Sequence, residues 1–151
     1  MRRNDREISE NETLSILKSA EYGVLSTVSK SGIPYGVPLS FCIIGRDLYF
    51  HCAVEGRKIE NLNQNNLVSF CVVGDTEVLA DEFGTKYESV ILSGKVIEVF
   101  EQTKRSALEG LLEKYSSPYM ESGLKYIDKL IDKTRVYKIE IEDMSGKSRN
   151  K

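Results

Sequence analysis

Apolar side chains recur at helical spacing near the start of the chain. Ser9 and Glu12 have the spacing of a capping box, in which each side chain accepts a backbone N–H of the other residue at a helix start. Leu14 and Leu17 continue an apolar face from this point. We therefore expect a short amphipathic helix over residues 8–20.

Beyond residue 22 the pattern changes to the two-residue alternation of β-strands. Val, Ile, Tyr and Phe dominate short runs, and turn signals such as Ser31-Gly32 and Gly45-Arg46-Asp47 separate them. Short strands with few intervening helices favour an antiparallel barrel or sandwich over a parallel sheet. Six strands are expected, five in the segment 22–100 and one at 135–142: residues 22–29, 34–44, 47–54, 67–74, 87–100 and 135–142.

Helical spacing returns in residues 103–134. Two amphipathic stretches lie on either side of Pro118, which predicts a helical pair. The strand at 135–142 follows this pair, and because a lone strand is not stable we expect it to return to the earlier sheet. The final residues, from Ser145, are expected to be frayed.

Composition points to one domain over residues 1–151. Hydrophobic residues make up 40% and charged residues 29%, as is usual for a soluble globular protein. The net charge of −2, from 21 basic and 23 acidic residues, argues against a nucleic-acid partner. No apolar run approaches the roughly 20 residues of a membrane span, and the N-terminus lacks the apolar core of a signal peptide.

The three cysteines, Cys42, Cys52 and Cys71, lie inside apolar runs. Free buried thiols in odd number suit a reducing compartment, so the expected localisation is cytoplasmic. The single histidine, His51, and these cysteines lack the paired spacing of a zinc site, so no metal is expected.

The segment "HCAVEGRKIENL", residues 51–62, holds the main candidate site. Alternation puts His51 and Ala53 on one face of a strand that ends at Gly56. "RKIENL" then reads as a helical turn, so Arg57 and Lys58 would stand in its first turn, where unpaired N–H groups point outward. Two cations are disfavoured there unless an anion is bound, which predicts a phosphate site.

Both features of this segment have plainer interpretations. Arg57 and Lys58 could be ordinary solvated surface charges, and His51 could be a packed, hydrogen-bonded residue. The sequence contains no GxSxG, GxGxxG after a strand, GxxxxGK[ST] or HExxH motif. If the protein is an enzyme, we therefore expect a cofactor to carry the chemistry.

Several stretches of the chain resemble the nitroimidazole-resistance (Nim) branch of the pyridoxamine 5'-phosphate oxidase-like flavoproteins: "YGVLST", "GIPYGVPLSF", "LYFHCAVEGRKIENL", "YESVILSGKV" and "IEDMSGK". The resemblance implies a mainly β fold with peripheral helices, a six-stranded antiparallel split β-barrel that binds FMN, with FAD as the alternative. It also implies a homodimer that holds each flavin at the subunit interface.

The resemblance assigns roles to particular residues. Arg57 and Lys58 would grip the phosphate after Gly56, and the isoalloxazine ring would lie along the proline-bearing strand, beside His51, Cys52 and Ala53. A second subunit would contribute from the segment around Tyr87. The full set of implied cofactor-binding residues is Val37, Pro38, Leu39, Ser40, His51, Cys52, Ala53, Gly56, Arg57, Lys58, Tyr87 and Ser89.

The leading functional hypothesis is an FMN-dependent oxidoreductase, in which NAD(P)H drives reduction of a small organic acceptor such as a nitroimidazole or another nitroaromatic. His51 is the candidate catalytic residue, as a proton donor. The alternative is a non-catalytic module that stores, senses or carries a flavin. A third hypothesis is a different cofactor, a deazaflavin or haem. The substrate-phosphate clamp of the parent oxidase is absent, which argues against oxidation of pyridoxamine phosphate.

Overall fold

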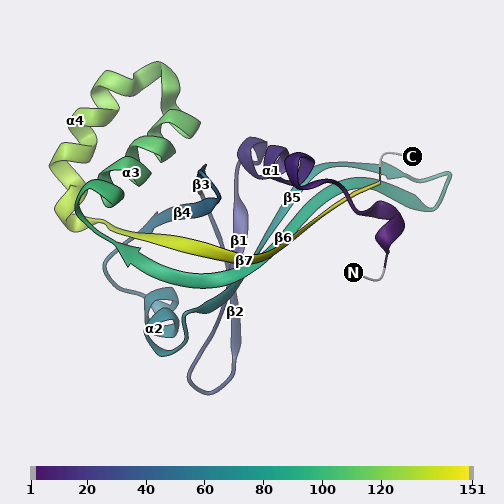
Figure 1. Ribbon diagram of the computed structural model, residues 1–151, viewed down its shortest axis with the longest axis horizontal. Helices are drawn as coiled ribbons and strands as arrows, with labels where there is room; N and C mark the ends of the chain where they lie inside the picture. The colour runs from purple at the N-terminus through teal and green to yellow at the C-terminus, as the bar shows by residue number, and fades with distance from the viewer. Residues whose placement is uncertain (1–2, 150–151) are drawn as a thin grey trace.

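The chain is organised around one curved antiparallel sheet (Figure 1), seen in a computed structural model that describes residues 3–149. The strands are β1 (Gly23–Val28), β2 (Pro34–Leu39), β3 (Cys42–Ile44), β4 (Asp47–Cys52), β5 (Leu67–Leu79), β6 (Gly84–Val99) and β7 (Arg135–Arg149). Their order is β2-β1-β5-β6-β7-β4-β3. Within the described residues β2 pairs only with β1 and β3 only with β4, so the sheet curls without closing.

Helices cover the ends and one side of this sheet. They are α1 (Glu10–Ser19), α2 (Arg57–Gln64), α3 (Glu101–Ser116) and α4 (Met120–Leu130), with short 3-10 turns at Asn4–Arg6, Ser117–Tyr119 and Ile131–Lys133. The predicted capping box is confirmed: the Glu12 carboxylate accepts the Ser9 backbone N–H at 2.8 Å, and the Ser9 hydroxyl accepts the Glu12 N–H. None of the helices in residues 3–149 has the length and apolar character to cross a bilayer.

The predicted mainly β antiparallel fold is confirmed, but the count of six strands is wrong. The run 34–44 is not one strand, because it breaks at Ser40 and Phe41 and the chain crosses from one edge of the sheet to the other. The Phe41 side chain is fully buried at this crossing. Its backbone N–H donates to the Tyr115 hydroxyl at 3.0 Å, and that hydroxyl lies 2.6 Å from the Glu21 carbonyl oxygen. A side chain from α3 thus replaces the lost strand pairing.

The last strand is also longer than the predicted 135–142. β7 continues to Arg149, because residues 143–149 pair with 87–93 of β6 in spite of their polar sequence. The expectation of a frayed end from Ser145 is therefore wrong for the described residues, and 150–151 lie outside them. With β5, these strands form the long extension at the right of Figure 1.

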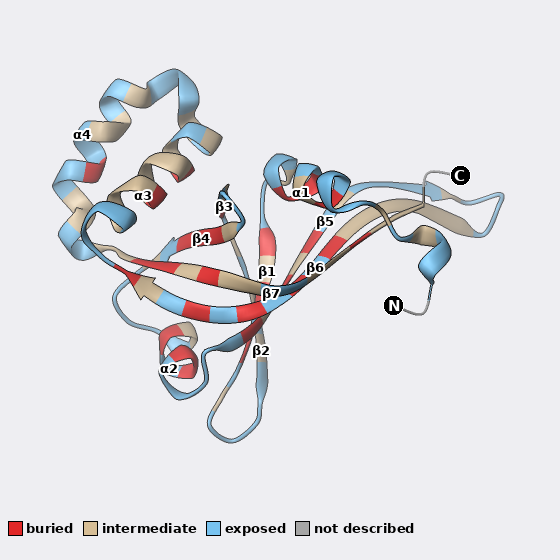
Figure 2. Cartoon of the chain, in the orientation of Figure 1, coloured by how far each residue is buried: buried red, intermediate tan, exposed pale blue. Residues whose placement is uncertain are grey.

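The barrel core lies on the concave face of the sheet. Leu25, Phe70 and Leu92 are paired neighbours on β1, β5 and β6, and all three are almost fully buried. The buried segments of these strands gather at the centre of the molecule in Figure 2. α1 contributes Ile16 and Leu17 to this core, and α2 contributes Leu62.

A second, smaller cluster lies between the convex side of β4 and the helical pair. Tyr49 and Val136 from the sheet pack with Ala107 and Leu111 from α3. The pair α3–α4 therefore stands outside the barrel, at the left of Figure 1, rather than inside its core.

Candidate functional site

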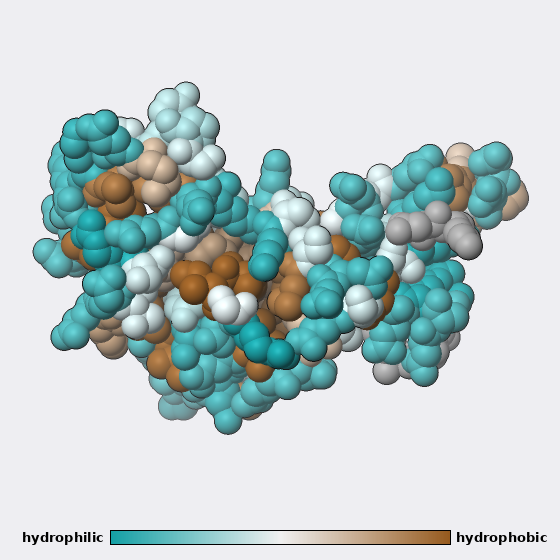
Figure 3. Space-filling view, turned by 45° about the horizontal axis from the view of Figure 1, so that its top comes forward, coloured by the Kyte–Doolittle hydropathy of each residue, from teal (hydrophilic) through white to brown (hydrophobic). Residues whose placement is uncertain are grey.

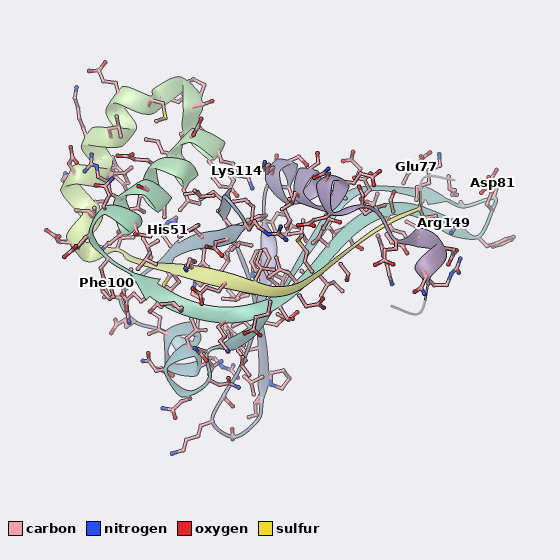
Figure 4. The ribbon with its side chains drawn as sticks, in the orientation of Figure 1. His51, Glu77, Asp81, Phe100, Lys114 and Arg149 are labelled. Carbon is pink, nitrogen blue, oxygen red and sulfur yellow. The ribbon has the colours of Figure 1, made fainter. Side chains whose placement is uncertain are left out.

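β4 separates its side chains onto two faces, as the sequence predicts. Phe50 is fully buried in the barrel core, and Cys52 packs against the same core. His51 points to the other face, where it shares a pocket with residues of α3 and α4. Figure 4 shows His51 on the side of β4 that faces this helical pair.

The helix that follows β4 begins without a cap. Gly56 is the N-cap residue of α2, has a φ of 130°, and offers no side chain to the N–H groups of the first turn. Ile59 N–H donates to the Gly56 carbonyl, whereas no side chain of the described residues caps the helix. An added Cβ at Gly56 would meet open space, so a ligand can approach the backbone there. This start of α2 offers free donors to an anion.

Arg57 and Lys58 place their charges at the opening of the unclosed sheet. The Arg57 guanidinium lies over the ring of Tyr35 on β2, 4.6 Å from its centroid. Lys58 Nζ lies 5.7 Å from the centroid of Phe50 on β4. Arg57 therefore lies against β2, and Lys58 lies against the part of β4 that β3 does not pair with, residues 50–52. These two strand segments do not pair with each other.

A buried chain of hydrogen bonds anchors α2 in this position. Asn61, which is 4% exposed, donates from Nδ2 to Thr27 Oγ1 at 2.9 Å. The Thr27 hydroxyl in turn donates to the Tyr35 carbonyl oxygen at 3.3 Å. Because Tyr35 also carries the ring beneath Arg57, one chain of contacts links the helix to both β1 and β2.

The segment expected to bind the isoalloxazine ring, residues 37–40, lies on the edge strand β2 and the residue that follows it. Val37 and Leu39 pack against the barrel core, whereas Pro38 and Ser40 are exposed. Pro38 lies opposite Val24 on β1 and has no strand on its other side within the described chain. This edge position explains how a strand tolerates the proline.

The environment of His51 lowers the pKa of its imidazole below the ordinary value. Partial burial is the larger cause, and the charge of Lys58 adds to it. The ring is therefore neutral near pH 7, so it can donate one N–H and accept at its other nitrogen. The neighbouring Cys52 thiol also has its pKa changed, raised mainly by burial, and is therefore protonated.

The structure does not bring all of the implied residues together within one chain. Ala53 and Gly56 lie in the exposed connection from β4 to α2, close in sequence to Arg57. Tyr87 and Ser89 lie in the part of β6 that pairs with the outer end of β7, at residues 147–149. Tyr87 accepts a hydrogen bond from Arg6 at 3.2 Å there, away from the start of α2.

Sequence reasoning missed three residues of this region. Tyr35, Thr27 and Asn61 hold Arg57 and the helix in place. Tyr35 and Thr27 lie outside the segment 51–62, and Asn61 lies inside it but received no role from the sequence. The one available signal was Asn61, a polar residue between Ile59 and Leu62 on a helix that buries both.

The residues at the start of α2 fit the phosphate of a flavin nucleotide. The N–H groups of an uncapped helix, a guanidinium and an ammonium are the donors that phosphate accepts. Two cations of the C-terminal third are engaged elsewhere: Arg135 forms a bidentate pair with Glu98, and Lys138 pairs with Glu140. Arg135 and Lys138 are thus not free to form a second phosphate site.

Comparison with known proteins identifies the class. The family model described as pyridoxamine 5'-phosphate oxidase matches residues 9–148, so the chain belongs to the pyridoxamine 5'-phosphate oxidase family. No curated protein sequence matches the chain.

Solved structures agree with this assignment. A protein of Bacteroides thetaiotaomicron, provisionally described as a 5-nitroimidazole antibiotic resistance protein, is 26% identical, with 93% of this chain and 85% of that chain covered and a TM-score of 0.75. A FAD-binding protein of Mesorhizobium loti is also 26% identical, covering 96% and 98%, with a TM-score of 0.65. A FAD and heme binding protein of Mycobacterium smegmatis, 17% identical over 97% and 74% with a TM-score of 0.79, shares the fold.

The hydrogen-bond chain beneath α2 generates a prediction about stability and anion binding. Thr27→Val keeps the shape of the side chain but leaves the buried Asn61 amide without its acceptor, which should cost about 1–3 kcal/mol. The urea midpoint should fall, and affinity for a phosphate ligand should fall with it because α2 loses its anchor. Thr27→Ser, which keeps the hydroxyl, is the matched control. Equal urea midpoints for Thr27→Val and the unmodified protein would contradict the anchoring role.

Proposed function

We propose that this chain binds FMN at the start of α2 and acts as an FMN-dependent oxidoreductase of the Nim type, reducing a small organic acceptor such as a nitroimidazole with electrons from NAD(P)H. The observation that supports it most directly is the uncapped first turn of α2, with Arg57 and Lys58, at the opening between β2 and β4. FAD is the alternative flavin. The bound flavin would supply the two-electron chemistry.

The residues of the chain would bind and orient the cofactor. Arg57 is held against Tyr35 and presents its fork to the phosphate, while Lys58 adds a point charge. The exposed edge at Pro38 and Ser40 would support the ring. His51, neutral near pH 7, would orient a ligand through its N–H rather than store a proton, which modifies the proton-donor role expected from an unperturbed pKa.

A homodimer is part of this proposal. On the convex face of the sheet, Pro38, Val24, Cys71, Ile91 and Ser145 form one continuous row across five strands. No side chain in this row is charged, and Ile91 is 54% exposed. A second copy packed by a two-fold axis would bury such a row on both chains. Ser89 and Tyr87 lie on the same face of β6. In the dimer, these two residues of the second copy would approach the flavin bound by the first.

The phosphate grip is tested by comparing two ligands that differ only in the phosphate. Arg57→Ala and Lys58→Ala should each weaken FMN binding by roughly 10- to 100-fold, since a hydrogen bond to a charged group contributes about 1.5–3 kcal/mol. Riboflavin affinity should be unchanged in both variants. Quenching of flavin fluorescence measures both affinities, and Lys30→Ala, which removes an exposed cation on the β1–β2 turn, controls for net charge. Undiminished FMN affinity in both variants would refute the proposed site.

Turnover is tested by anaerobic stopped flow, which also separates an enzyme from a flavin carrier. NADH or NADPH should bleach the flavin absorbance rapidly, and a nitroimidazole should restore it. His51→Ala should slow reoxidation roughly tenfold, the effect of losing one hydrogen bond of about 1.4 kcal/mol, whereas His51→Gln retains an N–H donor and should lose less. Very slow bleaching by both nucleotides would instead favour a non-catalytic module that stores, senses or carries the flavin.

The dimer is tested with a charge placed on the convex row. Ile91→Lys should convert the dimer to a monomer in analytical ultracentrifugation, because two copies of the charge would be buried against each other. Tyr119→Lys, which changes an exposed apolar position in the turn between α3 and α4, should leave the dimer intact. A monomer of the unmodified protein with flavin bound would contradict the proposed assembly.

A further inference from the structure

A pocket of about 360 Å³ lies between the convex side of β4 and the helical pair α3–α4. His51 forms part of its wall on the strand side, and Ser40 forms part at the crossing from β2 to β3. The other wall comes from the helices and the turn after α4. It also carries Tyr115, Ser116 and Tyr126, but most of it is aliphatic: Leu108, Leu111, Leu112, Ile127, Leu130 and Ile131. In Figure 3, hydrophobic side chains gather on this helical pair, at the upper left.

The charge of this wall is unusual for the molecule. No Asp, Glu, Lys or Arg lines the pocket, although such residues make up 29% of the chain. The cavity between α1 and β7, of about 530 Å³, is lined by Glu7, Glu142 and Asp143 among others. With His51 neutral near pH 7, the pocket carries no formal charge, so it would bury an ion without a partner, which is strongly unfavourable.

Two polar groups of the wall are already engaged. The Tyr115 hydroxyl bonds the backbone of Phe41 and Glu21, and the Thr134 hydroxyl donates to the Leu130 carbonyl oxygen. No hydrogen bond to the His51 imidazole occurs within residues 3–149, so this ring can meet a polar substituent of a ligand from the side of β4. Ser116 and Tyr126 bring further hydroxyl groups to the helical side of the pocket. A mostly apolar wall with a few polar groups is the usual design of a small-molecule site.

We infer that this pocket binds an uncharged aromatic molecule of one ring or two fused rings, with its ring between the aliphatic side chains of α3 and α4 and a polar substituent at His51. The volume lies toward the lower end of the range of about 300–1,000 Å³ that small-ligand sites occupy. This assignment depends on the proposed function at one point: the proposed function is what makes the bound molecule the electron acceptor. Segment 51–58 links the pocket to the cations at the start of α2. It therefore joins an uncharged acceptor site to a charged phosphate site.

The test compares two probes of the same size and different charge, 4-nitrobenzyl alcohol and 4-nitrobenzoate. Both are titrated into the FMN-loaded protein at pH 7.5, and the imidazole NMR signal of His51, the only histidine of the chain, reports occupancy of this pocket. The alcohol should shift that signal and bind at least roughly tenfold more tightly than the carboxylate, a difference of about 1.4 kcal/mol. Equal affinities, or binding of the alcohol that leaves the His51 signal unmoved, would overturn the inference.

A charge introduced into the wall provides the decisive variant. Leu130→Lys should weaken the alcohol and strengthen the carboxylate, reversing the preference, because the half-buried side chain then offers the anion a partner. Gln102→Lys adds the same charge on the exposed first turn of α3, outside the pocket, and should leave the preference unchanged. Thr134→Lys repeats the test from another part of the wall if Leu130→Lys does not fold. An unaltered preference in the folded variant would refute the assignment.

The same titration without flavin separates this inference from the proposed function. If the protein fails to bind FMN but the alcohol still shifts the His51 signal, the proposed function fails and the pocket assignment stands. If FMN binds through Arg57 and Lys58 but the alcohol is not preferred, the pocket assignment fails and the proposed function stands.

Discussion

The failure of the sheet to close is the constraint on which the rest of this structure depends. A single run of chain leaves β2 at one edge and enters β3 at the other, and the crossing at Phe41 needs the Tyr115 hydroxyl to satisfy backbone groups that strand pairing would otherwise satisfy. Because the edges stay apart, α2 can occupy the opening with Arg57 toward one edge and Lys58 toward the other. A closed barrel would leave no such opening.

The segment from His51 to Lys58 separates two electrostatic environments. On the helical-pair side, the wall carries no formal charge and the pKa of the imidazole is lowered. At the start of α2, two cations and free N–H groups face outward. Since Lys58 contributes to the lowered pKa of His51, this cation also helps to keep the neighbouring pocket neutral. Charge on one side of the segment and neutrality on the other are thus coupled.

Much of the fold could be predicted from the sequence because it is encoded locally. Alternation placed β4 and the faces of Phe50 and His51, and Gly56 followed by two cations marked the start of α2. The break at Ser40 escaped prediction, since only the distant Tyr115 makes it stable. The extension of β7 escaped for a similar reason, because its polar residues are strands only through pairing with β6. The roles of Thr27 and Asn61 likewise escaped prediction, because the hydrogen bond between them joins residues that are far apart in the sequence.

The position of α3 and α4 outside the barrel has a consequence for how relatives of this protein can diverge. The helices meet so closely at Gly123 that an added Cβ would overlap Leu112, so the close approach of the pair depends on this glycine. Tyr115, Ala107 and Leu111 of α3 contact the sheet or the crossing at Phe41. Substitutions elsewhere on these helices can reshape the pocket while the β-core and the start of α2 stay unaltered, because distant sites act nearly additively. Such a division allows the shape of the pocket to change at low risk to folding.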